Sequence, residues 1–258
     1  MVAVDGSRHD GRILVVGMGR SGAAAAMTAL RELPGVGVVV CDEKKEPLAA
    51  ADVNALREAG ALVELGRCDP GLLEGCGLVI KSPGVPRKNP LIEEALGRGI
   101  PVWGEVEFAR KFLKNVIVGI TGTNGKTTTA ELVGHILAGA GKPCRVAGNV
   151  GKALSSLVGS VGDDEVLVVE LSSFQLEDSI DFRPDVAVLL NLAEDHLNRH
   201  DTLDDYFAAK MRIFANQGVG DTAVLNFDDE NIRGCELPGG VDSVWFSRTT
   251  GGRLGGGA

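Results

Sequence analysis

The stretch VGITGTNGKTTTAE at residues 118–131 combines an apolar strand, a glycine-rich turn and the start of a helix. In such a turn backbone N–H groups point inward, an ammonium reaches the β- and γ-phosphates, and a hydroxyl can bind Mg²⁺. The stretch departs from G-x-x-x-x-G-K-[ST], because Ile120 stands at the place of the first glycine. A glycine turn followed by an ordinary lysine is the alternative, although strand, turn and helix all lie where phosphate binding requires them. The residues predicted to bind a nucleoside triphosphate are Gly122, Thr123, Asn124, Gly125, Lys126, Thr127 and Thr128.

Composition limits the classes of protein that come into question. The chain has 258 residues, of which 44% are hydrophobic, so it can bury the cores of two ordinary domains. Its formal net charge of -9 leaves no broad basic surface for a nucleic-acid backbone. No apolar run reaches the roughly 18 residues of a membrane span, and the N-terminus lacks the order of a signal peptide. We expect a cytoplasmic protein that binds neither nucleic acid nor membrane.

The cysteines give no metal or disulfide signature. They are Cys41, Cys68, Cys76, Cys144 and Cys235, and no two of them form a C-x-x-C pair. Each stands beside apolar or glycine residues. The sequence therefore predicts small core residues in a reducing compartment rather than a zinc site or a disulfide framework.

Short apolar runs alternate with helical stretches from residue 12 onward, as in a parallel sheet covered by helices. A break near residue 112, after the predicted helix 105–113, divides the chain into domains 1–112 and 113–258. We expect an α/β fold, with a Rossmann-like N-terminal domain and a P-loop ATPase-like central domain that has a mostly parallel sheet. The predicted strands are 12–17, 36–42, 61–66, 77–82 and 100–104 in the first domain, and 115–121, 143–148, 165–171, 185–192, 222–227 and 242–247 in the second.

A second glycine-rich turn, GMGRSG at residues 17–22, lies directly between an apolar strand and a helix. Asp42 ends the next strand, 20 residues beyond Gly22. This spacing meets the dinucleotide fingerprint, in which glycines allow a tight turn, the helix N-terminus binds pyrophosphate and the acid binds a ribose. From the residues alone, NAD or NADP, another pyrophosphate ligand and a structural turn all stay open. The turn predicts a phosphate cradle better than it predicts the ligand.

Three further side chains bear on the difference between a nucleotide switch and an enzyme. Glu170 ends the apolar run EVLVVEL, where an open α/β sheet places its ligands, and it is either a Mg²⁺ ligand or a surface charge. His196, in NLAEDHLNRH, follows the next apolar run, and a solvated turn histidine is the alternative. Lys210, in YFAAKMRIF, would be a plain surface lysine on sequence alone.

Four motifs in order resemble the Mur ligases of bacterial peptidoglycan synthesis, and this resemblance covers nearly the whole chain. The motif ELSSFQLE, together with GMGRSG and KSPGVPRKNP (81–90), resembles the members that add D-glutamate to UDP-N-acetylmuramoyl-L-alanine. The four motifs are highly specific in this order, whereas the N-terminal turn alone is a weak signal. They are TGTNGKTTT (121–129), ELSSFQLE (170–177), NLAEDHLNRH (191–200) and YFAAKMRIF (206–214).

The resemblance implies roles for catalytic and metal-binding residues. Lys126 would hold the transferring phosphates, and Thr127 with Glu170 would hold one Mg²⁺. His196 and Lys210 would hold a second Mg²⁺, and the lysine is carbamylated by CO₂ in this family. A carbamate is an oxygen donor suited to a hard cation, whereas a protonated amine is no ligand.

The resemblance also implies that UDP, rather than NAD, occupies the first glycine loop. Asn149 would contact the muramoyl-alanine part of the substrate, and Ser172 would lie near its carboxylate. The implied substrate-binding residues are Gly17, Gly19, Arg20, Ser21, Gly22, Asp42, Ser82, Gly84, Asn149, Ser172 and Gln175.

The implied reaction is ATP-driven amide formation in cell wall biogenesis, a process tied to cell shape, cell division and the cell cycle. The substrate carboxylate attacks the γ-phosphorus of ATP, and the amine of D-glutamate then displaces phosphate from the acyl phosphate. Two Mg²⁺ ions and one lysine would spread the charge on the phosphoryl oxygens. We expect a monomer.

Members of the family continue into a third domain that supplies further ATP contacts and much of the D-glutamate site. This chain ends in RLGGGA, so we expect a partial or inactive form. Three rival hypotheses stay open: another amide ligase of the superfamily, such as a folylpolyglutamate synthase, a nucleotide-binding protein without chemistry, and an NAD dehydrogenase. The motif ELSSFQLE argues against the first, and the joint presence of Glu170, His196 and Lys210 argues against the second.

Overall fold

The computed structural model describes all residues except 1, 5–6, 10, 47–49, 194–201 and 250–258. The chain forms two compact units. One comprises Met1–Lys114 with Ala153–Ser160, and the other comprises Asn115–Lys152 with Val161–Ala258. The segment Ala153–Ser160, which the sequence analysis assigns to the second domain, therefore clusters with the first unit.

The first unit contains a parallel sheet of five strands in the order β5-β4-β3-β6-β7. Strand β3 is central, and the chain builds outward from it first in one direction and then in the other. This is the order of a doubly wound nucleotide-binding fold, whose ligands bind beyond the carboxyl ends of the strands next to the reversal point. The strands are β3 (Arg12–Val16), β4 (Val38–Asp42), β5 (Leu62–Leu65), β6 (Cys76–Lys81) and β7 (Val102–Gly104).

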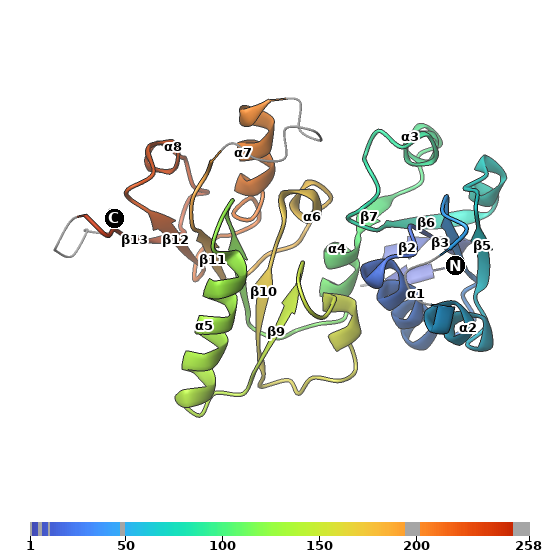
Figure 1. Ribbon diagram of the computed structural model, residues 1–258, viewed down its shortest axis with the longest axis horizontal. Helices are drawn as coiled ribbons and strands as arrows, with labels where there is room; N and C mark the ends of the chain where they lie inside the picture. Colours follow the sequence, from blue (N-terminus) through green and yellow to red (C-terminus); the bar gives the residue numbers. More distant parts are fainter. Residues whose placement is uncertain (1, 5–6, 10, 47–49, 194–201, 250–258) are drawn as a thin grey trace. The chain divides into compact units, whose positions relative to one another are not determined.

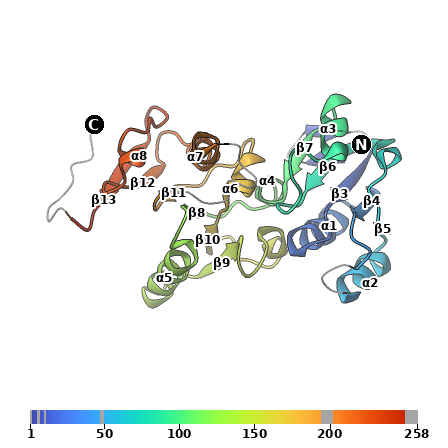
Figure 2. The ribbon, with the colours of Figure 1, turned by 45° about the horizontal axis from the view of Figure 1, so that its top comes forward.

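Helices cover both faces of this sheet. Helices α1 (Arg20–Glu32), α2 (Ala50–Glu58) and α4 (Glu105–Arg110) pack on one face. Helix α3 (Pro90–Gly97) packs on the other, together with the short 3-10 helix η1 (Pro70–Leu73). Figures 1 and 2 both show α3 on the opposite side of the sheet from α1 and α2.

Because side chains alternate between the two faces of the sheet, the first unit has a hydrophobic core on each face. In β3, Ile13 and Val15 belong to the core under α1, whereas Leu14 and Val16 belong to the core under α3. All four are essentially inaccessible to solvent. Because successive side chains of a strand point to opposite faces, an unbroken apolar run is what a strand buried on both faces requires.

A short antiparallel pair of strands precedes β3. Its strands are β1 (Val2–Val4) and β2 (Ser7–His9). The sequence analysis identifies no strand here, because a segment of three residues is too short to show an alternating pattern.

The second unit contains a parallel sheet of six strands in the order β13-β12-β11-β8-β10-β9. Strand β8 lies between β10 and β11, so the direction of winding reverses beside its carboxyl end. The loop that follows β8 therefore lies at the point where such sheets bind ligands. The strands are β8 (Ile117–Thr121), β9 (Cys144–Gly148), β10 (Val166–Glu170), β11 (Val186–Leu189), β12 (Thr222–Asn226) and β13 (Asp242–Phe246).

Helix α5 (Lys126–Gly139) packs along β8, β9 and β10, as Figure 1 shows. Helices α6 (Ser173–Glu177) and α7 (Leu203–Met211) contact each other, and α8 (Glu230–Arg233) follows β12. Helix α5 starts directly after the loop at the carboxyl end of β8. Its N-terminus therefore points at the same edge of the sheet as the strand ends.

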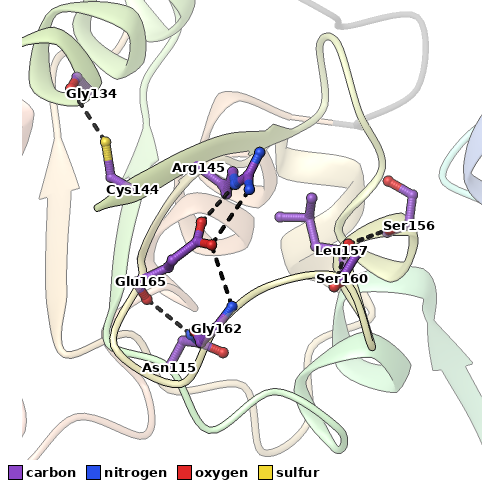
Figure 3. A network of polar contacts seen from close by, with 9 residues as sticks. All are labelled: Asn115, Gly134, Cys144, Arg145, Ser156, Leu157, Ser160, Gly162 and Glu165. Carbon is purple, nitrogen blue, oxygen red and sulfur yellow. Dashed lines mark hydrogen bonds and ion pairs between the residues drawn. The ribbon is translucent and has the colours of Figure 1, made fainter. Parts of the chain in front are cut away.

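Polar contacts fix the turn that leads into β10 (Figure 3). The amide of Asn115 is buried and donates to the carbonyl oxygens of Gly162 at 2.7 Å and Glu165 at 2.9 Å. The guanidinium of Arg145 donates to the Glu165 carboxylate at 2.6 Å, and this hydrogen bond lowers the pKa of Glu165. The ion pair is exposed and contributes little to stability. The buried Asn115 contacts are the ones that hold the turn in place.

The segment Ala153–Ser160 joins the first unit through buried polar contacts. It contains the 3-10 helix η2 (Leu154–Leu157), which packs against α1 and α4. The hydroxyl of Thr28 donates to the Ser155 carbonyl at 2.8 Å, and the Ser155 N–H donates to the Glu105 carboxylate at 2.6 Å. Burial raises the pKa of Glu105, and the hydrogen bond from Ser155 only partly opposes this. These contacts explain why a segment distant in sequence completes the first unit.

Every strand predicted from sequence matches a strand of the structure, so the predicted α/β class with two parallel sheets is confirmed. The expectation for the cysteines is only partly met. Cys41 is buried, but Cys68, Cys76, Cys144 and Cys235 are partly exposed, and all five are free thiols. Within the described part of the chain, no helix is both long and apolar enough to cross a membrane.

Candidate active site

The phosphate-loop candidate connects β8 to α5. Gly125 is the N-cap of α5 and has a φ of 80°, a left-handed conformation that favours glycine. Among the described residues, no side chain caps this end of the helix. The first N–H groups of a helix have no partners within it, and the helix dipole favours negative charge there. The geometry therefore suits a phosphate group at the N-terminus of α5.

Asn191 holds the loop in place from the segment after β11. Its backbone carbonyl accepts from the N–H of Thr123 at 3.0 Å. Its side-chain carbonyl accepts from the N–H of Asn124 at 2.8 Å, and its amide donates to the Asn124 carbonyl at 3.0 Å. Asn191 is the first residue of the motif NLAEDHLNRH, but the sequence alone predicts no role for it. Its bidentate pairing with Asn124 is a reason for an asparagine at this position.

Lys126 lies over the loop rather than away from it. Its ammonium donates to the carbonyl oxygens of Gly122 at 2.9 Å and Thr123 at 2.8 Å. The side chain is half-buried, and its ammonium lies against the backbone of the loop that precedes α5. Hydrogen bonds between charged partners are stronger than those to neutral carbonyls. A phosphate at the N-terminus of α5 can therefore compete for the ammonium.

Glu170 joins the phosphate loop to the end of β9. Its carboxylate accepts from the hydroxyl of Thr127 at 2.7 Å and from the amide of Asn149 at 3.1 Å. The Asn149 N–H also donates to the Glu170 backbone carbonyl at 2.9 Å. Glu170 is only 3% exposed, which excludes the surface-charge interpretation. Three residues that the sequence places far apart thus meet at one point.

This cluster fits a magnesium ion. A carboxylate and a hydroxyl are oxygen donors of the kind that Mg²⁺ takes from proteins. Within the described residues no group of three or more His, Cys, Asp or Glu side chains is arranged to hold a metal ion. Mg²⁺ commonly binds through one or two carboxylates with phosphate oxygens and waters, so one carboxylate beside a phosphate loop is sufficient.

Lys210 lies inside the protein, on α7. It is 1% exposed, and its ammonium donates to the Gly122 carbonyl at 2.8 Å. The ammonium also lies 4.4 Å from the centre of the Tyr206 ring, and the Tyr206 hydroxyl lies 3.2 Å from the Thr123 hydroxyl. The surface-lysine interpretation, which sequence alone favours, is therefore wrong. Lys126 and Lys210 both donate to the carbonyl of Gly122.

His196, the remaining candidate of this set, lies outside the described residues. Ser172 and Gln175 lie at the start of α6 and form a capping box. The Ser172 hydroxyl accepts from the Gln175 N–H at 3.3 Å, and the Gln175 side-chain carbonyl accepts from the Ser172 N–H at 3.0 Å. The amide nitrogen of Gln175 is buried without a hydrogen-bond partner in the described part of the chain. The capping box gives both residues a structural role.

A cavity of about 720 Å³ extends from the N-terminus of α5 along the carboxyl ends of β11, β12 and β13. Asn124 and Gly125 line it at one end, and Asn226, Asp229 and Arg248 line it farther along. The amide of Asn226 donates to the Leu190 carbonyl at 2.8 Å, and the Asp229 carboxylate accepts from the Leu192 N–H at 2.7 Å. No site residue between 226 and 248 is predicted from the sequence, because single polar residues in loops carry no spacing signal.

Asp228 fixes the segment after β13, which forms part of the cavity wall. Its carboxylate accepts from the hydroxyls of Ser247 and Thr249, each at 2.6 Å, and from the Arg248 N–H at 2.7 Å. These hydrogen bonds lower the pKa of Asp228 to about 2. Asp228 therefore accepts hydrogen bonds as a carboxylate throughout the neutral range.

A second cavity, of about 520 Å³, lies in the first unit at the carboxyl ends of its strands. Predicted substrate-binding residues meet there, whereas Arg20, Ser21 and Gly22 belong to the start of α1. At Gly22 an added Cβ would lie 1.9 Å from the Gly17 carbonyl oxygen, so only glycine allows the helix to approach the loop this closely. The predicted residues that line the cavity are Gly17, Gly19, Asp42, Ser82 and Gly84.

Asp42 orders the glycine loop of the first unit. Its carboxylate accepts from the Met18 N–H at 2.6 Å and from the Lys44 N–H at 2.8 Å. The spacing pattern predicts an acid on a ribose, but in the structure the same carboxylate already holds the loop backbone. Asp42 therefore shapes the cavity wall in addition to any contact with a ligand.

Comparisons with known proteins find relatives for both units. Residues 120–248 match the Mur ligase middle domain, and residues 11–104 match the MurD-like N-terminal domain of Mur ligases. The chain is 45% identical over 240 residues to a UDP-N-acetylmuramoylalanine--D-glutamate ligase of Pelotomaculum thermopropionicum. It is 43% identical over 239 residues to one of Koribacter versatilis. Each match covers 92% of this chain and 52% of the relative, so the chain spans about half the length of these relatives.

Solved structures give the same grouping. A UDP-N-acetylmuramate-alanine ligase from Thermotoga maritima superposes with a TM-score of 0.53 at 25% identity, covering 92% of this chain and 53% of that chain. A UDP-N-acetylmuramate:L-alanyl-gamma-D-glutamyl-meso-diaminopimelate ligase from Neisseria meningitides has a TM-score of 0.57 at 19% identity, covering 91% and 78%. The second likeness supports the fold alone.

Proposed function

This chain belongs to the Mur ligase family, and on that premise we propose that its protein is an ATP-dependent, ADP-forming ligase that joins D-glutamate to UDP-N-acetylmuramoyl-L-alanine. The observation that carries the proposal is the cluster of Thr127, Asn149 and Glu170 beside an uncapped helix N-terminus. The names of the relatives at 45% and 43% identity support this choice of substrates. The reaction would belong to peptidoglycan synthesis in the cytoplasm, with the protein as a monomer.

We propose that ATP binds to the second unit. Its phosphates would lie on the loop 122–128, with the ammonium of Lys126 on the β- and γ-phosphates. The adjoining cavity of about 720 Å³ is large enough for the ribose and base. Thr127 and Glu170 would hold Mg²⁺, which supplies positive charge for the phosphoryl oxygens when it is bound.

We propose that Lys210 and His196 serve a second Mg²⁺. The amine of Lys210 would lose a proton and take up CO₂ as a carbamate, which provides oxygen donors. Its position supports the proposal, because Lys210 is 1% exposed and its ammonium donates to the Gly122 carbonyl of the phosphate loop at 2.8 Å. The described residues give no position for His196.

The first unit would bind the UDP part of the substrate. Its cavity of about 520 Å³ lies at the reversal point of the sheet, where doubly wound folds bind nucleotides. Backbone N–H groups of the loop 17–22 would bind the diphosphate, and Ser82 with Gly84 would form the opposite wall. In the second unit, Asn149, Ser172 and Gln175 would bind the muramoyl-alanine part. The amide nitrogen of Gln175, which has no hydrogen-bond partner among the described residues, would be a donor for it.

The proposed reaction begins when the substrate carboxylate attacks the γ-phosphorus of ATP. A carboxylate is a poor electrophile, and phosphorylation gives its carbon a leaving group. The amine of D-glutamate then adds to that carbon, and phosphate leaves. Lys126 would stabilise the charge that develops on the phosphoryl oxygens, and the ordered loop would keep the reacting groups in line.

An NAD dehydrogenase and a nucleotide-binding protein without chemistry are the rival functions. The first rests on the spacing of the GMGRSG turn, and the family assignment argues against it. The second leaves the burial of both Glu170 and Lys210 beside one phosphate loop without a reason.

The test measures ADP release with UDP-N-acetylmuramoyl-L-alanine, with and without D-glutamate, on this chain and on a version extended to the length of its relatives. We expect both to bind the UDP substrate and MgATP in calorimetry, and the extended version to release ADP only when the UDP substrate is present. Tight NAD binding without binding of the UDP substrate, or ADP release independent of it, would contradict the proposal.

A further inference from the structure

Two cysteines meet in the wall of the cavity of the first unit. Cys41 lies near the end of β4, is fully buried and packs in the core beneath α3. Cys68 follows β5, packs against the same core and lines the cavity. They are 27 positions apart in the sequence, and the function proposed above uses neither of them.

An isolated bridge lies next to both residues in the chain. Asp42 pairs with Arg67 in an antiparallel bridge, which brings their chain neighbours Cys41 and Cys68 close together. Both cysteines pack in the core beneath α3. The two thiol groups also share a hydrogen bond.

The shared hydrogen bond makes the two thiols chemically unequal. Donation from the Cys41 thiol lowers the pKa of Cys68, although partial burial and the carboxylates of Glu43 and Asp42 oppose this. The same contact and complete burial raise the pKa of Cys41. The thiolate therefore forms on Cys68, which is the partner that a small oxidant can reach from the cavity.

We propose that Cys41 and Cys68 are a redox-active thiol pair that hydrogen peroxide converts into a disulfide within the wall of the cavity. The Cys68 thiolate attacks one peroxide oxygen, so an S–O bond forms, the O–O bond breaks and the leaving hydroxide takes up a proton. The Cys41 sulfur then attacks the sulfenic sulfur, so the S–S bond forms, the S–O bond breaks and a second water leaves with the Cys41 proton. The two thiols lose two electrons, and peroxide is reduced to two waters.

The disulfide would link the turn after β5 to β4. The residue after Cys41 in β4 is Asp42, whose carboxylate holds the glycine loop. Closing a loop of this length restricts the unfolded chain, so the oxidised protein is more stable. This inference does not depend on which ligand occupies the cavity.

The experiment uses the full chain. The reduced protein is treated with hydrogen peroxide, its free thiols are alkylated, and a non-reducing digest is analysed by mass spectrometry. We expect the Cys41–Cys68 linkage, with alkylated Cys76, Cys144 and Cys235, and a higher Tm that dithiothreitol reverses. In Cys41→Ser we expect higher oxidation states of Cys68 and no rise in Tm.

Cys76→Ser is the matched control, because Cys76 packs against the same core but burial raises the pKa of its thiol. This variant keeps the Cys41–Cys68 linkage and the rise in Tm if the proposal holds. Equal oxidation of all five cysteines, a linkage of Cys68 to Cys76, or linkage only between separate molecules would overturn it.

Discussion

Replacing Lys126 by alanine tests the phosphate loop with a single change. The Lys126 ammonium donates to the carbonyls of Gly122 and Thr123, and the Gly122 carbonyl keeps its hydrogen bond from Lys210 when the Lys126 ammonium is removed. Asn191 keeps its three hydrogen bonds to the loop, so the loop stays ordered. We therefore expect a folded protein whose free energy of unfolding changes by less than about 1 kcal/mol.

The loss of ATP affinity follows from the hydrogen bonds that the ammonium would make to phosphate. A hydrogen bond to a charged group contributes about 1.5–3 kcal/mol. At about 1.4 kcal/mol for each factor of ten, the Kd for MgATP should rise by roughly 10- to 150-fold. AMP has no β- or γ-phosphate, so its Kd should not change.

Calorimetry with MgATP, ADP and AMP measures this directly on the purified chain. Lys142→Ala is the matched control, because Lys142 is an exposed lysine just beyond the other end of the same helix. It loses the same charge without touching the loop. An unchanged Kd for MgATP in Lys126→Ala, or an equal loss for AMP, would refute the assignment of this lysine to the β- and γ-phosphates.

Three further predictions concern other residues. Burial raises the pKa of Glu105, so the contribution of this carboxyl to stability is complete below its unfolded pKa of about 4.3 and is lost as the pH rises through its folded pKa. Glu105→Gln should therefore raise the Tm at pH 8 and flatten the decline of Tm with pH. An unchanged slope would contradict the raised pKa of Glu105. Gly22→Ala should lower the Tm and abolish UDP binding in calorimetry, since its Cβ would lie 1.9 Å from the Gly17 carbonyl oxygen, and normal binding would show that the close approach is unnecessary. Lys210 should give a carbamate signal in ¹³C NMR with ¹³C-bicarbonate that Lys210→Arg lacks, and equal spectra would exclude carbamylation.

Much of the fold follows from local pattern. The runs around Ile13, Val39 and Val168 are apolar without interruption, which is what strands buried on both faces need. The segment Ala153–Ser160 could not be assigned in this way, because its place depends on the buried contact between Ser155 and Glu105. A contact between residues 50 positions apart leaves no trace in periodicity.

The candidate site could also be predicted only in part. The phosphate loop around Lys126 could be predicted from the sequence, because its function requires a fixed spacing of glycines, a lysine and a hydroxyl. The burial of Lys210 could not be predicted, since it depends on how α7 packs, and one lysine in a helix resembles any other. Asn191 and Asp228 act through hydrogen bonds to residues far away in the sequence or across a loop, and only the folded structure identifies their partners.

Hydrogen exchange measured by mass spectrometry tests most directly the central claim that each unit binds its own nucleotide. UDP-N-acetylmuramoyl-L-alanine should slow exchange in residues 17–22 and 82–85, and MgATP should slow exchange in residues 122–128. Protection of residues 17–22 by NAD but not by the UDP substrate, or the absence of protection of residues 122–128 by MgATP, would contradict the account.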